Sequence, residues 1–386
     1  MTEPSWRAWA ATEAESIRAA QRWREPRDFD GAGPVGAVDG SATPVVSFAS
    51  NDYLGLTQHP SVVAAAHAAL DRWGAGSGSA RLIVGSRPVH VELEAALASW
   101  KGTERAVLFP TGFAANLGVL TTFGARGVVV CSDELNHASI IDGCRLSKAT
   151  TAVYRHMDLD HLDWLLSRRA GERALVVSDT VFSMDGDLAD LDGLCGVARR
   201  HGALLVLDEA HAVLGPTLPD ELPDDLDVVR IGTLSKTLGS LGGFVAASAA
   251  LAELIVNRAR SYIFTTAATP ADSAAALAAL RVLTSPEGAA LVARLRAHVE
   301  RVRPGHGSPI VPILCGDDGR AVAASAALLE RGFLVPAIRP PTVPVGTSRL
   351  RVALSAAHTT EQVDALVAAL VALELSPTPS EPAPSR

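Results

Sequence analysis

The chain has 386 residues, of which 48% are hydrophobic and 20% are charged, and its 34 basic and 42 acidic residues give a net charge of −8. This length and apolar content exclude a disulfide-stapled mini-protein and a disordered regulator, and the acidic balance argues against non-specific binding to nucleic acid or anionic membranes. The four cysteines form no CxxC pair, so we expect free thiols in a reducing cytoplasm.

The N-terminal part of the chain is predicted to be a helical arm followed by the start of a large domain. An amphipathic helix is expected over 6–24, and the segment 27–45 is rich in glycine and proline. Prolines at helix starts predict two further helices, over 60–73 and 88–101. We expect no signal peptide, and no apolar run of about 20 residues predicts a transmembrane helix.

Residues 105–245 alternate between short apolar runs and helical stretches. Runs such as VVVC, ALVVSD and ALLVLD lack polar alternation, which is typical of strands buried on both faces of a parallel sheet. The sequence therefore predicts an α/β fold with a mainly parallel sheet.

The C-terminal third is predicted to form a smaller α+β domain. An alanine-rich helix is expected over 270–300, and three apolar runs are separated and followed by helices over 319–332 and 360–374. The residues from Ser376 onward are rich in proline and serine and are expected to be disordered. The predicted divisions are an arm over 1–50, a large domain over 51–272, a small domain over 273–375 and a tail over 376–386.

Only three of the 34 basic residues are lysines, so any chemistry that needs a lysine amine has three candidates. Lys101 and Lys148 lie at helix ends and are expected to be solvated. Lys236 follows an apolar strand in VVRIGTLSKTLGSLGG, among hydroxyl groups and glycines. Desolvation there would lower the pKa of the amine and make it a nucleophile and a base.

The motif DEAH at 208–211 ends the apolar run ALLVLD. Ligands of parallel α/β sheets bind beyond the carboxyl ends of strands, which places Asp208 and His211 where a ligand would lie. A helicase-type box would need a phosphate-binding loop upstream, and Ser235 stands where a Walker A lysine is preceded by glycine. An imine-forming lysine and a carboxylate that can pair with a pyridinium nitrogen instead indicate a pyridoxal-phosphate site.

The phosphate of such a cofactor needs its own cradle. The segment TGF at 111–113 follows the apolar run AVLFP and opens a predicted helix. Backbone N–H groups at a helix N-terminus favour an anion. Thr233 adds a hydroxyl close in sequence to Lys236, so both features can serve the same phosphate.

Seven stretches between residues 20 and 372 resemble the α-oxoamine synthases, a family of fold-type-I pyridoxal-phosphate enzymes. They are SNDYLGL (50–56), TGFAANLGVL (111–120), DELNHASIIDGCRLS (133–147), VFSMDGDLADL (181–191), VLDEAHAVLG (206–215), TLSKTLGSLGG (233–243) and AIRPPTVPVGTSRLRVALSAAH (337–358). The resemblance implies pyridoxal 5′-phosphate as cofactor, a seven-stranded sheet in the large domain and a homodimer with a shared active site.

The last stretch most resembles the biotin-pathway branch of that family. Members of this branch condense L-alanine with pimeloyl-CoA or a pimeloyl-carrier protein to give 8-amino-7-oxononanoate, the free thiol and CO2. Alternatives are a sibling synthase that uses glycine or serine with another acyl-CoA, an aminotransferase, and a catalytically silent subunit. The last of these predicts loss of the lysine or the aspartate, and both are present.

The resemblance also implies roles for single residues. Lys236 would carry the cofactor as a Schiff base and remove the Cα proton, Asp208 would keep the pyridine nitrogen protonated, and His137 would stack on the ring and polarise the thioester. Further cofactor contacts would come from His211, Ser183, Thr233, Gly112 and Phe113 and, across the subunit interface, from Thr265 and Thr266. Substrate contacts would come from Arg22, Asn51, His137, Thr342 and Arg351.

Several of these assignments have competitors. Arg24 competes with Arg22, and Arg349 lies on the same face of a predicted strand as Arg351. His137 could cap a helix instead. Ser183 could be a turn residue.

A run rich in histidine and aspartate extends from His156 to Asp163. Such residue types can bind metals, but a solvated turn and a helix start also account for them. We expect the turn and helix start, and no metal site.

Overall fold

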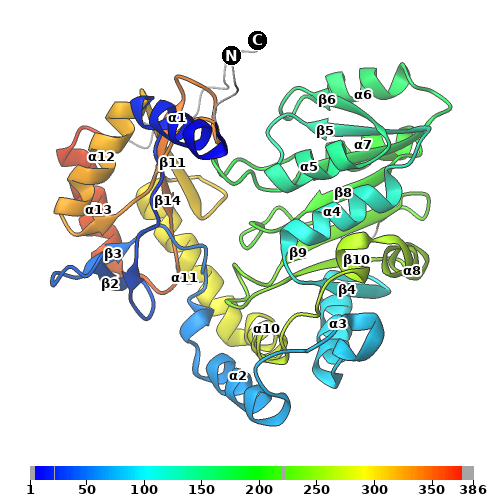
Figure 1. Cartoon of the computed structure of the whole chain (residues 1–386), viewed down its shortest axis with the longest axis horizontal. Coiled ribbons are helices and arrows are strands. Elements are labelled where there is room, and N and C mark those ends of the chain that lie inside the picture. The colour runs from blue at the N-terminus through cyan, green and yellow to red at the C-terminus, as the bar shows by residue number, and fades with distance from the viewer. Residues whose placement is uncertain (1–4, 21, 220–221, 376–386) are drawn as a thin grey trace.

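The computed structural model describes residues 5–20, 22–219 and 222–375 and places one large sheet beside two small ones (Figure 1). The large sheet has seven strands in the order β4-β10-β9-β8-β7-β5-β6. Every neighbouring pair is parallel except the two that involve β10. The predicted mainly parallel seven-stranded sheet is therefore confirmed. Its strands are β4 (Arg105–Phe109), β5 (Val128–Asp133), β6 (Thr150–Tyr154), β7 (Arg173–Asp179), β8 (Leu204–Asp208), β9 (Val228–Thr233) and β10 (Gly243–Ala247).

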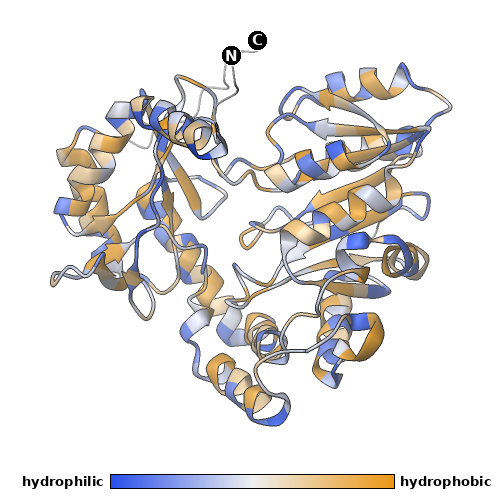
Figure 2. Cartoon of the chain, in the orientation of Figure 1, coloured by the Kyte–Doolittle hydropathy of each residue, from blue (hydrophilic) through white to orange (hydrophobic). Residues whose placement is uncertain are grey.

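Helices cover both faces of the large sheet. On β5, Val128 and Val130 enter the cluster that holds residues of α4, α5 and α8, whereas Val129 and Cys131 enter the cluster with α6 and α7. The strands lack polar alternation because both faces are buried, and Figure 2 shows the hydrophobic colouring concentrated on them. The helices are α4 (Gly112–Phe123), α5 (Ala138–Leu146), α6 (Leu159–Ser167), α7 (Leu191–Arg200), α8 (Ala249–Arg258) and α9 (Arg260–Ile263).

Polar side chains cap the starts of four of these helices. Thr111, His137, Asp158 and Asp190 each accept a hydrogen bond from a backbone N–H in the first turn of α4, α5, α6 and α7. The caps fix where α4 and α5 begin, and both helices begin next to the candidate site.

The two small sheets combine strands from both ends of the chain. Their orders are β1-β2-β3-β12 and β11-β14-β13. The strands are β1 (Phe29–Asp30), β2 (Val35–Val38), β3 (Val45–Ser47), β11 (Ile310–Gly316), β12 (Phe333–Leu334), β13 (Ala337–Ile338) and β14 (Ser348–Ala353). The helices on this side are α1 (Trp6–Ala19), α11 (Pro286–Val302), α12 (Asp318–Glu330) and α13 (Thr360–Ala372).

Three helices lie below both groups of sheets in Figure 1: α2 (Pro60–Trp73), α3 (Pro88–Lys101) and α10 (Pro270–Leu283). Helix α10 packs against both α2 and α3. Two short helical segments, η1 (Leu56–Gln58) and η2 (Arg81–Gly85), precede α2 and α3. The predicted divisions at 1–50, 51–272 and 273–375 stay a prediction, and 376–386 lies outside the described residues.

Two predicted helices differ from the structure. The N-terminal helix ends at Ala19 instead of 24, because none of its side chains is buried and it therefore gains little from packing that would hold a further turn. The helix expected over 270–300 is two helices, α10 and α11, bent by 80°. Ser285 caps the second of them and Pro286 is its first residue, so the chain starts a new helix there.

Within the described ranges, no single helix is long and apolar enough to cross a membrane. Helices α10 and α11 meet the length and composition requirements only as a pair, across their bend.

Candidate active site

The candidate site lies at the carboxyl ends of β8 and β9, which are parallel neighbours. Asp208 is the last residue of β8, and Lys236 lies in the loop that follows β9. Because parallel strands end at the same edge, two residues predicted from separate motifs meet at one place.

Lys236, His211 and Tyr53 form a buried chain of polar contacts. Lys236 Nζ lies 2.8 Å from His211 Nε2, and His211 Nδ1 lies 2.6 Å from Tyr53 Oη. Burial lowers the pKa of Lys236 below its ordinary 10.5, although Asp208 opposes this shift. Burial, and then the nearby charge of Lys236, lower the pKa of His211 well below 6.5. A neutral imidazole therefore joins the amine to the phenol.

Asp208 is 6% exposed and is held by two donors. Asn116 Nδ2 donates to Oδ2 at 2.7 Å, and the backbone N–H of Ala210 donates to Oδ1 at 2.9 Å. Asn116 Nδ2 also donates to Ser139 Oγ, which fixes the amide itself. The carboxylate is thus oriented by α4 and by the backbone that follows β8.

Gly112 and Thr233 lie side by side at the N-terminus of α4. A Cβ on Gly112 would lie 3.5 Å from Thr233 Cβ, and a Cβ on Gly243 would lie 2.5 Å from the backbone N of Gly112. Thr233 Oγ1 also bonds to Ser235 Oγ at 2.7 Å. The close approach leaves a helix N-terminus beside hydroxyl groups, which suits an anion. Phe113, the next residue, is 42% exposed.

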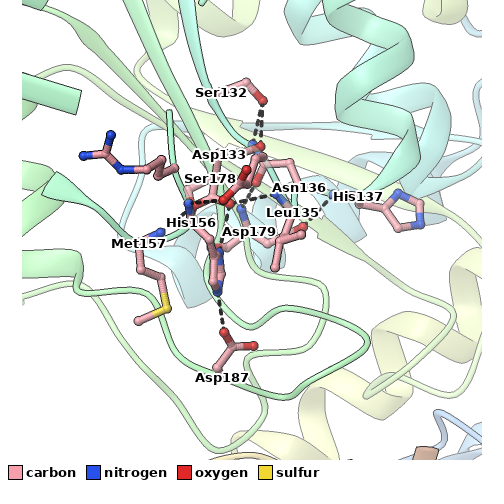
Figure 3. Close-up of polar contacts among 12 residues, drawn as sticks. Ser132, Asp133, Leu135, Asn136, His137, His156, Met157, Ser178, Asp179 and Asp187 are labelled. Carbon is pink, nitrogen blue, oxygen red and sulfur yellow. Dashed lines mark hydrogen bonds and ion pairs between the residues drawn. The ribbon is translucent and has the colours of Figure 1, made fainter. Parts of the chain in front are cut away.

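His137 caps α5, so the alternative raised for it is observed. Its Nδ1 accepts from the backbone N–H of Ser139 at 3.2 Å, and its own backbone N–H donates to Asp179 Oδ2 at 2.8 Å. Burial lowers the pKa of His137, which keeps the ring neutral. Figure 3 shows this ring pointing away from the polar cluster behind it. Capping through Nδ1 leaves the ring face free, and the stacking role stays a prediction.

The structure distinguishes Arg351 from Arg349, whereas their positions on one face of a strand did not show which of them would bind the substrate carboxylate. Arg351 donates from a terminal nitrogen to Asn51 Oδ1 at 3.1 Å and from Nε to the carbonyl of Ser183 at 2.6 Å. Arg349 is ion-paired with Asp185. The contacts of Arg351 are to neutral groups, so its charge is available to an anionic ligand, whereas that of Arg349 is already balanced.

Four predicted residues do not join this cluster. Within the described part of the chain, none of them hydrogen-bonds to Lys236, Asp208 or His211; they are Arg22, Thr265, Thr266 and Thr342. Arg22 Nε lies 3.8 Å from Asp318 Oδ2, and Arg24, Thr266 and Thr342 are exposed.

Sequence reasoning missed Tyr53, Asn116 and Asp179. Tyr53 and Asn116 lie in SNDYLGL and TGFAANLGVL, two stretches that carried the family resemblance, so a signal was present. Asp179 ends β7 beside Asp208 in the parallel register, and burial and the Asp208 charge raise its pKa well above the ordinary value.

The prediction that Lys101 is solvated is wrong, whereas Lys148 is exposed as predicted. Lys101 Nζ lies 2.7 Å from Glu209 Oε2, and its side chain is 10% exposed. Arg230 Nε contacts the other carboxylate oxygen at 2.8 Å. The lysine is buried because this carboxylate, distant in sequence, provides a partner at the end of α3.

The run from His156 to Asp163 is also less solvated than predicted. Asp158 caps α6, as a helix start requires, but His156 lies between two carboxylates. No group of three or more His, Cys, Asp or Glu side chains suited to a metal is found among the described residues.

The chain is similar to known proteins over most of its length. The family model for class I and II aminotransferases matches residues 43–370. The 8-amino-7-oxononanoate synthase of Anaeromyxobacter sp. (strain K) is 50% identical, covering 97% of this chain and 97% of that protein. The enzyme of that name from Geobacter sulfurreducens is 45% identical, covering 93% and 96%.

Solved structures agree. The serine palmitoyltransferase of Sphingomonas wittichii is 31% identical with a TM-score of 0.87, covering 97% of this chain and 99% of that chain. A lysine-to-alanine variant of the S. paucimobilis serine palmitoyltransferase, with a bound PLP–myriocin aldimine, also gives a TM-score of 0.87 at 30% identity, covering 95% of this chain and 98% of that chain. The 8-amino-7-oxononanoate synthase of Francisella tularensis gives 0.69 at 27%, covering 86% and 98%.

Proposed function

This chain belongs to the aminotransferase class I and II family, among the 8-amino-7-oxononanoate synthases, and we propose that it condenses L-alanine with pimeloyl-CoA or a pimeloyl-carrier protein. The new C–C bond joins the alanine Cα to the acyl carbonyl. The thiol leaves, the alanine carboxylate departs as CO2, and 8-amino-7-oxononanoate remains for biotin biosynthesis. The observation that carries the proposal is 50% identity over 97% of the chain to an enzyme of that name.

The residues at the strand ends fit pyridoxal 5′-phosphate, the cofactor of this family. Lys236 offers a buried amine beside a neutral imidazole, and Asn116 Oδ1 is a buried acceptor without a hydrogen-bond partner among the described residues. The close contact of Gly112 with Thr233 supports a phosphate at the start of α4. Bound there, the cofactor supplies an electron sink for the charge that develops at the amino-acid Cα.

Each residue of the cluster has a proposed role in holding the cofactor. Lys236 would bind it covalently, Asp208 would pair with the ring nitrogen and His137 would stack on the ring. The ring oxygen would face His211 and Ser183. The phosphate would be held by Gly112, Phe113 and Thr233 and, from the partner subunit's chain, by the residues equivalent to Thr265 and Thr266.

Asp208 would keep a proton on the ring nitrogen. A buried carboxylate stabilises a cation beside it, because little water is present to screen the charge. The two donors on Asp208 keep its oxygens in place, which supports this role.

Lys236 would also act as the base that takes the Cα proton. A lowered pKa leaves more of the amine unprotonated near neutral pH, so it can accept a proton. His211, which is neutral and 2.8 Å away, would orient the amine for that transfer.

Arg351 and Asn51 would hold the substrate carboxylate, because a guanidinium recognises a carboxylate through paired hydrogen bonds. The contact of these two side chains with each other supports a shared ligand. His137 would polarise the thioester carbonyl. Further substrate contacts are proposed for Arg22 and Thr342.

We also propose a homodimer. Four apolar side chains are exposed at η2 and just after α9, and their exposed fractions are 51% for Leu82, 73% for Ile83, 68% for Val84 and 69% for Phe264. Helix α9 contacts both η2 and α4, whose N-terminus is the proposed phosphate site. An exposed apolar patch at this position supports a second copy of the chain covering it.

A cytoplasmic location is part of the proposal. All four cysteines are free thiols and three of them are buried. Free thiols persist in reducing compartments such as the cytoplasm, which supports this location.

A second candidate function has one observation in its favour. The TM-score of 0.87 with serine palmitoyltransferase exceeds the 0.69 with the Francisella enzyme, which favours a sibling synthase that uses serine or glycine with another acyl-CoA. Sequence identity favours the first candidate, because this chain is 50% identical to the Anaeromyxobacter 8-amino-7-oxononanoate synthase and only 31% identical to serine palmitoyltransferase.

Product identification tests the proposal. Purified, cofactor-loaded protein is mixed with L-alanine, glycine or L-serine and with pimeloyl-CoA or palmitoyl-CoA, and the products are identified by mass. We expect 8-amino-7-oxononanoate, free CoA and CO2 from L-alanine and pimeloyl-CoA alone. A preferred product from serine or glycine would replace the proposal with the second candidate.

A further inference from the structure

His156 lies between two loops that border the candidate site, and its imidazole contacts a carboxylate on each side (Figure 3). It follows β6, and its Nδ1 lies 3.0 Å from Asp133 Oδ1 at the end of β5. Its Nε2 lies 2.5 Å from Asp187 Oδ2 in the loop after β7. The ring of Phe182 packs edge-on against it, with ring centroids 4.4 Å apart.

The two carboxylates require a charged ring. A neutral imidazole has one N–H and one lone pair, so it can donate to only one of two carboxylates, whereas an imidazolium donates to both. Burial alone would lower the pKa of His156, but the hydrogen bonds and charges of Asp133 and Asp187 raise it to about 10. Asp185 also interacts electrostatically with both His156 and Asp187, and His306 interacts with Asp187.

The backbone around His156 is tied down as well. Its own N–H donates to Glu134 Oε1 at 2.8 Å, and the N–H of Met157 donates to Asp133 Oδ2 at 2.9 Å. Met157 has φ +55°, a left-handed conformation that side chains other than glycine seldom adopt. The segment holds this conformation because Asp133 binds both the ring and the backbone that follows it.

Asp187 belongs to a tight turn over residues 181–188, here called the 181–188 turn. Val181 and Leu188 form a bridge across it, and the N–H of Phe182 donates to the carbonyl of Asp187 at 3.1 Å. A Cβ on Gly186, which has φ +69°, would lie 2.1 Å from the carbonyl oxygen of Ile310. The turn therefore fits closely between the large sheet and the strand β11 of the small sheet.

The 181–188 turn carries two contacts to the arginines of β14. The carbonyl of Ser183 accepts from Arg351 Nε at 2.6 Å, and Asp185 pairs with Arg349. The position of the Arg351 guanidinium thus depends on the turn, and the turn is connected to β5 and β6 through His156.

We propose that His156 is a positioning residue: ion-paired with both Asp133 and Asp187, it fixes the 181–188 turn and, through the Ser183 carbonyl, the guanidinium of Arg351 that receives the amino-acid carboxylate. The second half of this inference rests on the proposed function. The hydrogen bonds of His156 among the described residues go to Asp133, Glu134 and Asp187, none of which is proposed to hold the substrate or the cofactor.

Hydrogen exchange of the cofactor-loaded enzyme tests whether the two ion pairs of His156, here called the His156 clamp, hold the 181–188 turn in place. His156→Gln removes both ion pairs, and we expect exchange in residues 181–188 to become faster by about tenfold, with the ends of β8 and β9 unchanged. The matched control is His201→Gln, because His201 Nε2 also contacts a carboxylate, Asp163, at 3.0 Å but at the C-terminal end of α7. Unchanged exchange in 181–188 of His156→Gln would overturn the clamp.

Steady-state kinetics test the link to Arg351. In His156→Gln we expect the KM for L-alanine to rise by about tenfold while kcat stays within about twofold and the cofactor absorbance band keeps its wild-type position. Asp187→Asn should act in the same direction, and the double variant should be no worse than His156→Gln, because both single changes remove the contact between His156 and Asp187. A loss in kcat with unchanged KM, or additive effects, would overturn this link.

The ionisation of His156 is measured directly in the wild-type enzyme. With 15N-labelled histidine, the His156 ring signals should stay those of an imidazolium from pH 7 to about pH 9 and disappear from that position in Asp187→Asn. A neutral His156 ring at pH 8 would overturn the clamp. If His156→Gln fails to fold, Asp187→Asn gives the exchange and kinetic results.

These readouts separate the two proposals. If the wild-type enzyme makes no product from L-alanine, the proposed function fails, whereas exchange and ring ionisation still decide whether His156 clamps the turn. In that case the KM is measured for the amino acid the enzyme does use, and an unchanged value in His156→Gln would overturn the link to Arg351.

Discussion

Lys236 and Lys101 are both buried lysines, yet they have opposite kinds of partner. Lys101 Nζ lies 2.7 Å from Glu209 Oε2, whereas Lys236 Nζ lies 2.8 Å from the neutral ring of His211. The two lysines lie near each other at the end of β8. Asp208 lies in the region of Lys236, and Glu209, the next residue, pairs with Lys101. Burial lowers the pKa of both amines, so burial alone does not tell a reactive lysine from a structural one.

The partner makes the difference. Lys101 and Arg230 hold the pKa of Glu209 below its ordinary 4.5 against the opposing effect of burial, so this carboxylate stays charged and keeps Lys101 charged beside it. Lys101 Nζ also lies 3.8 Å from the centroid of the Trp100 ring. No carboxylate forms an ion pair with Lys236 among the residues described, so its amine can give up its proton at modest cost.

The largest expected effect is that of Lys236→Ala. Without the amine no covalent bond to the cofactor forms and no base is present at the Cα proton, so turnover should fall by at least about a thousandfold. The absorbance band of the bound cofactor should be lost in the same variant. Lys148→Ala, a change at the exposed lysine, is the control and should keep both. Wild-type turnover in Lys236→Ala would show that Lys236 is not the reactive lysine and that it does not differ from Lys101 in this way.

The second-largest effect is expected from substitutions of the adjacent carboxylates Asp208 and Glu209. Asp208→Asn should lower kcat by about a hundredfold, because a neutral amide no longer holds a proton on the cofactor ring. Its midpoint of unfolding should fall only slightly, since the amide oxygen can still accept from Asn116 and only the hydrogen bond from the backbone N–H of Ala210 is lost. Glu209→Gln should do the reverse: it should keep kcat and lower the midpoint. Equal loss of kcat in the two variants would show that the two regions are not separate.

Lys101→Met isolates the structural lysine. Removing one partner of a buried ion pair costs about 3 kcal/mol, at the lower end of the usual range because Arg230 still pairs with Glu209. Urea unfolding of the variant measures this cost, and turnover per folded molecule should stay within about twofold. A stability equal to that of the wild type would mean that the pair contributes nothing beyond what a methionine side chain supplies.

The same two lysines show which parts of the site local sequence can predict. Lys236 was predictable because the signal is local: an apolar strand before it, hydroxyls and glycines around it. Lys101 was not, because its partner Glu209 lies far away in sequence and only the packing of α3 against the sheet brings them together. The mainly parallel sheet was predictable for the local reason, since most of its strands appear as short apolar runs, whereas its seven strands were implied only by the family resemblance.

Long-range contacts also account for the remaining misses. Tyr53 and His211 are 158 positions apart, and spacing gave no reason to pair them. Arg349 and Arg351 lie on the same face of the strand, and they are distinguished by partners far away in sequence, such as Asp185, 164 positions from Arg349. The capping pair Ser285 and Pro286 was a local signal, so that helix break could have been predicted.

The smallest expected effect is that of Tyr53→Phe, which tests whether the neutral imidazole depends on its second partner. Burial raises the pKa of Tyr53 to about 12, so the phenol keeps its proton, and its oxygen lies 2.6 Å from His211 Nδ1 and 3.1 Å from Asn51 Oδ1, either of which can accept that proton in a hydrogen bond. Its loss leaves a buried nitrogen unpaired, and we expect about 1 kcal/mol less stability and about a tenfold drop in kcat/KM. Tyr154→Phe, at an equally buried tyrosine on the edge strand β6, should keep kcat/KM within about twofold. If Tyr53→Phe matches this control, His211 holds Lys236 without help from the phenol, and the neutral character of the Lys236 region rests on burial alone.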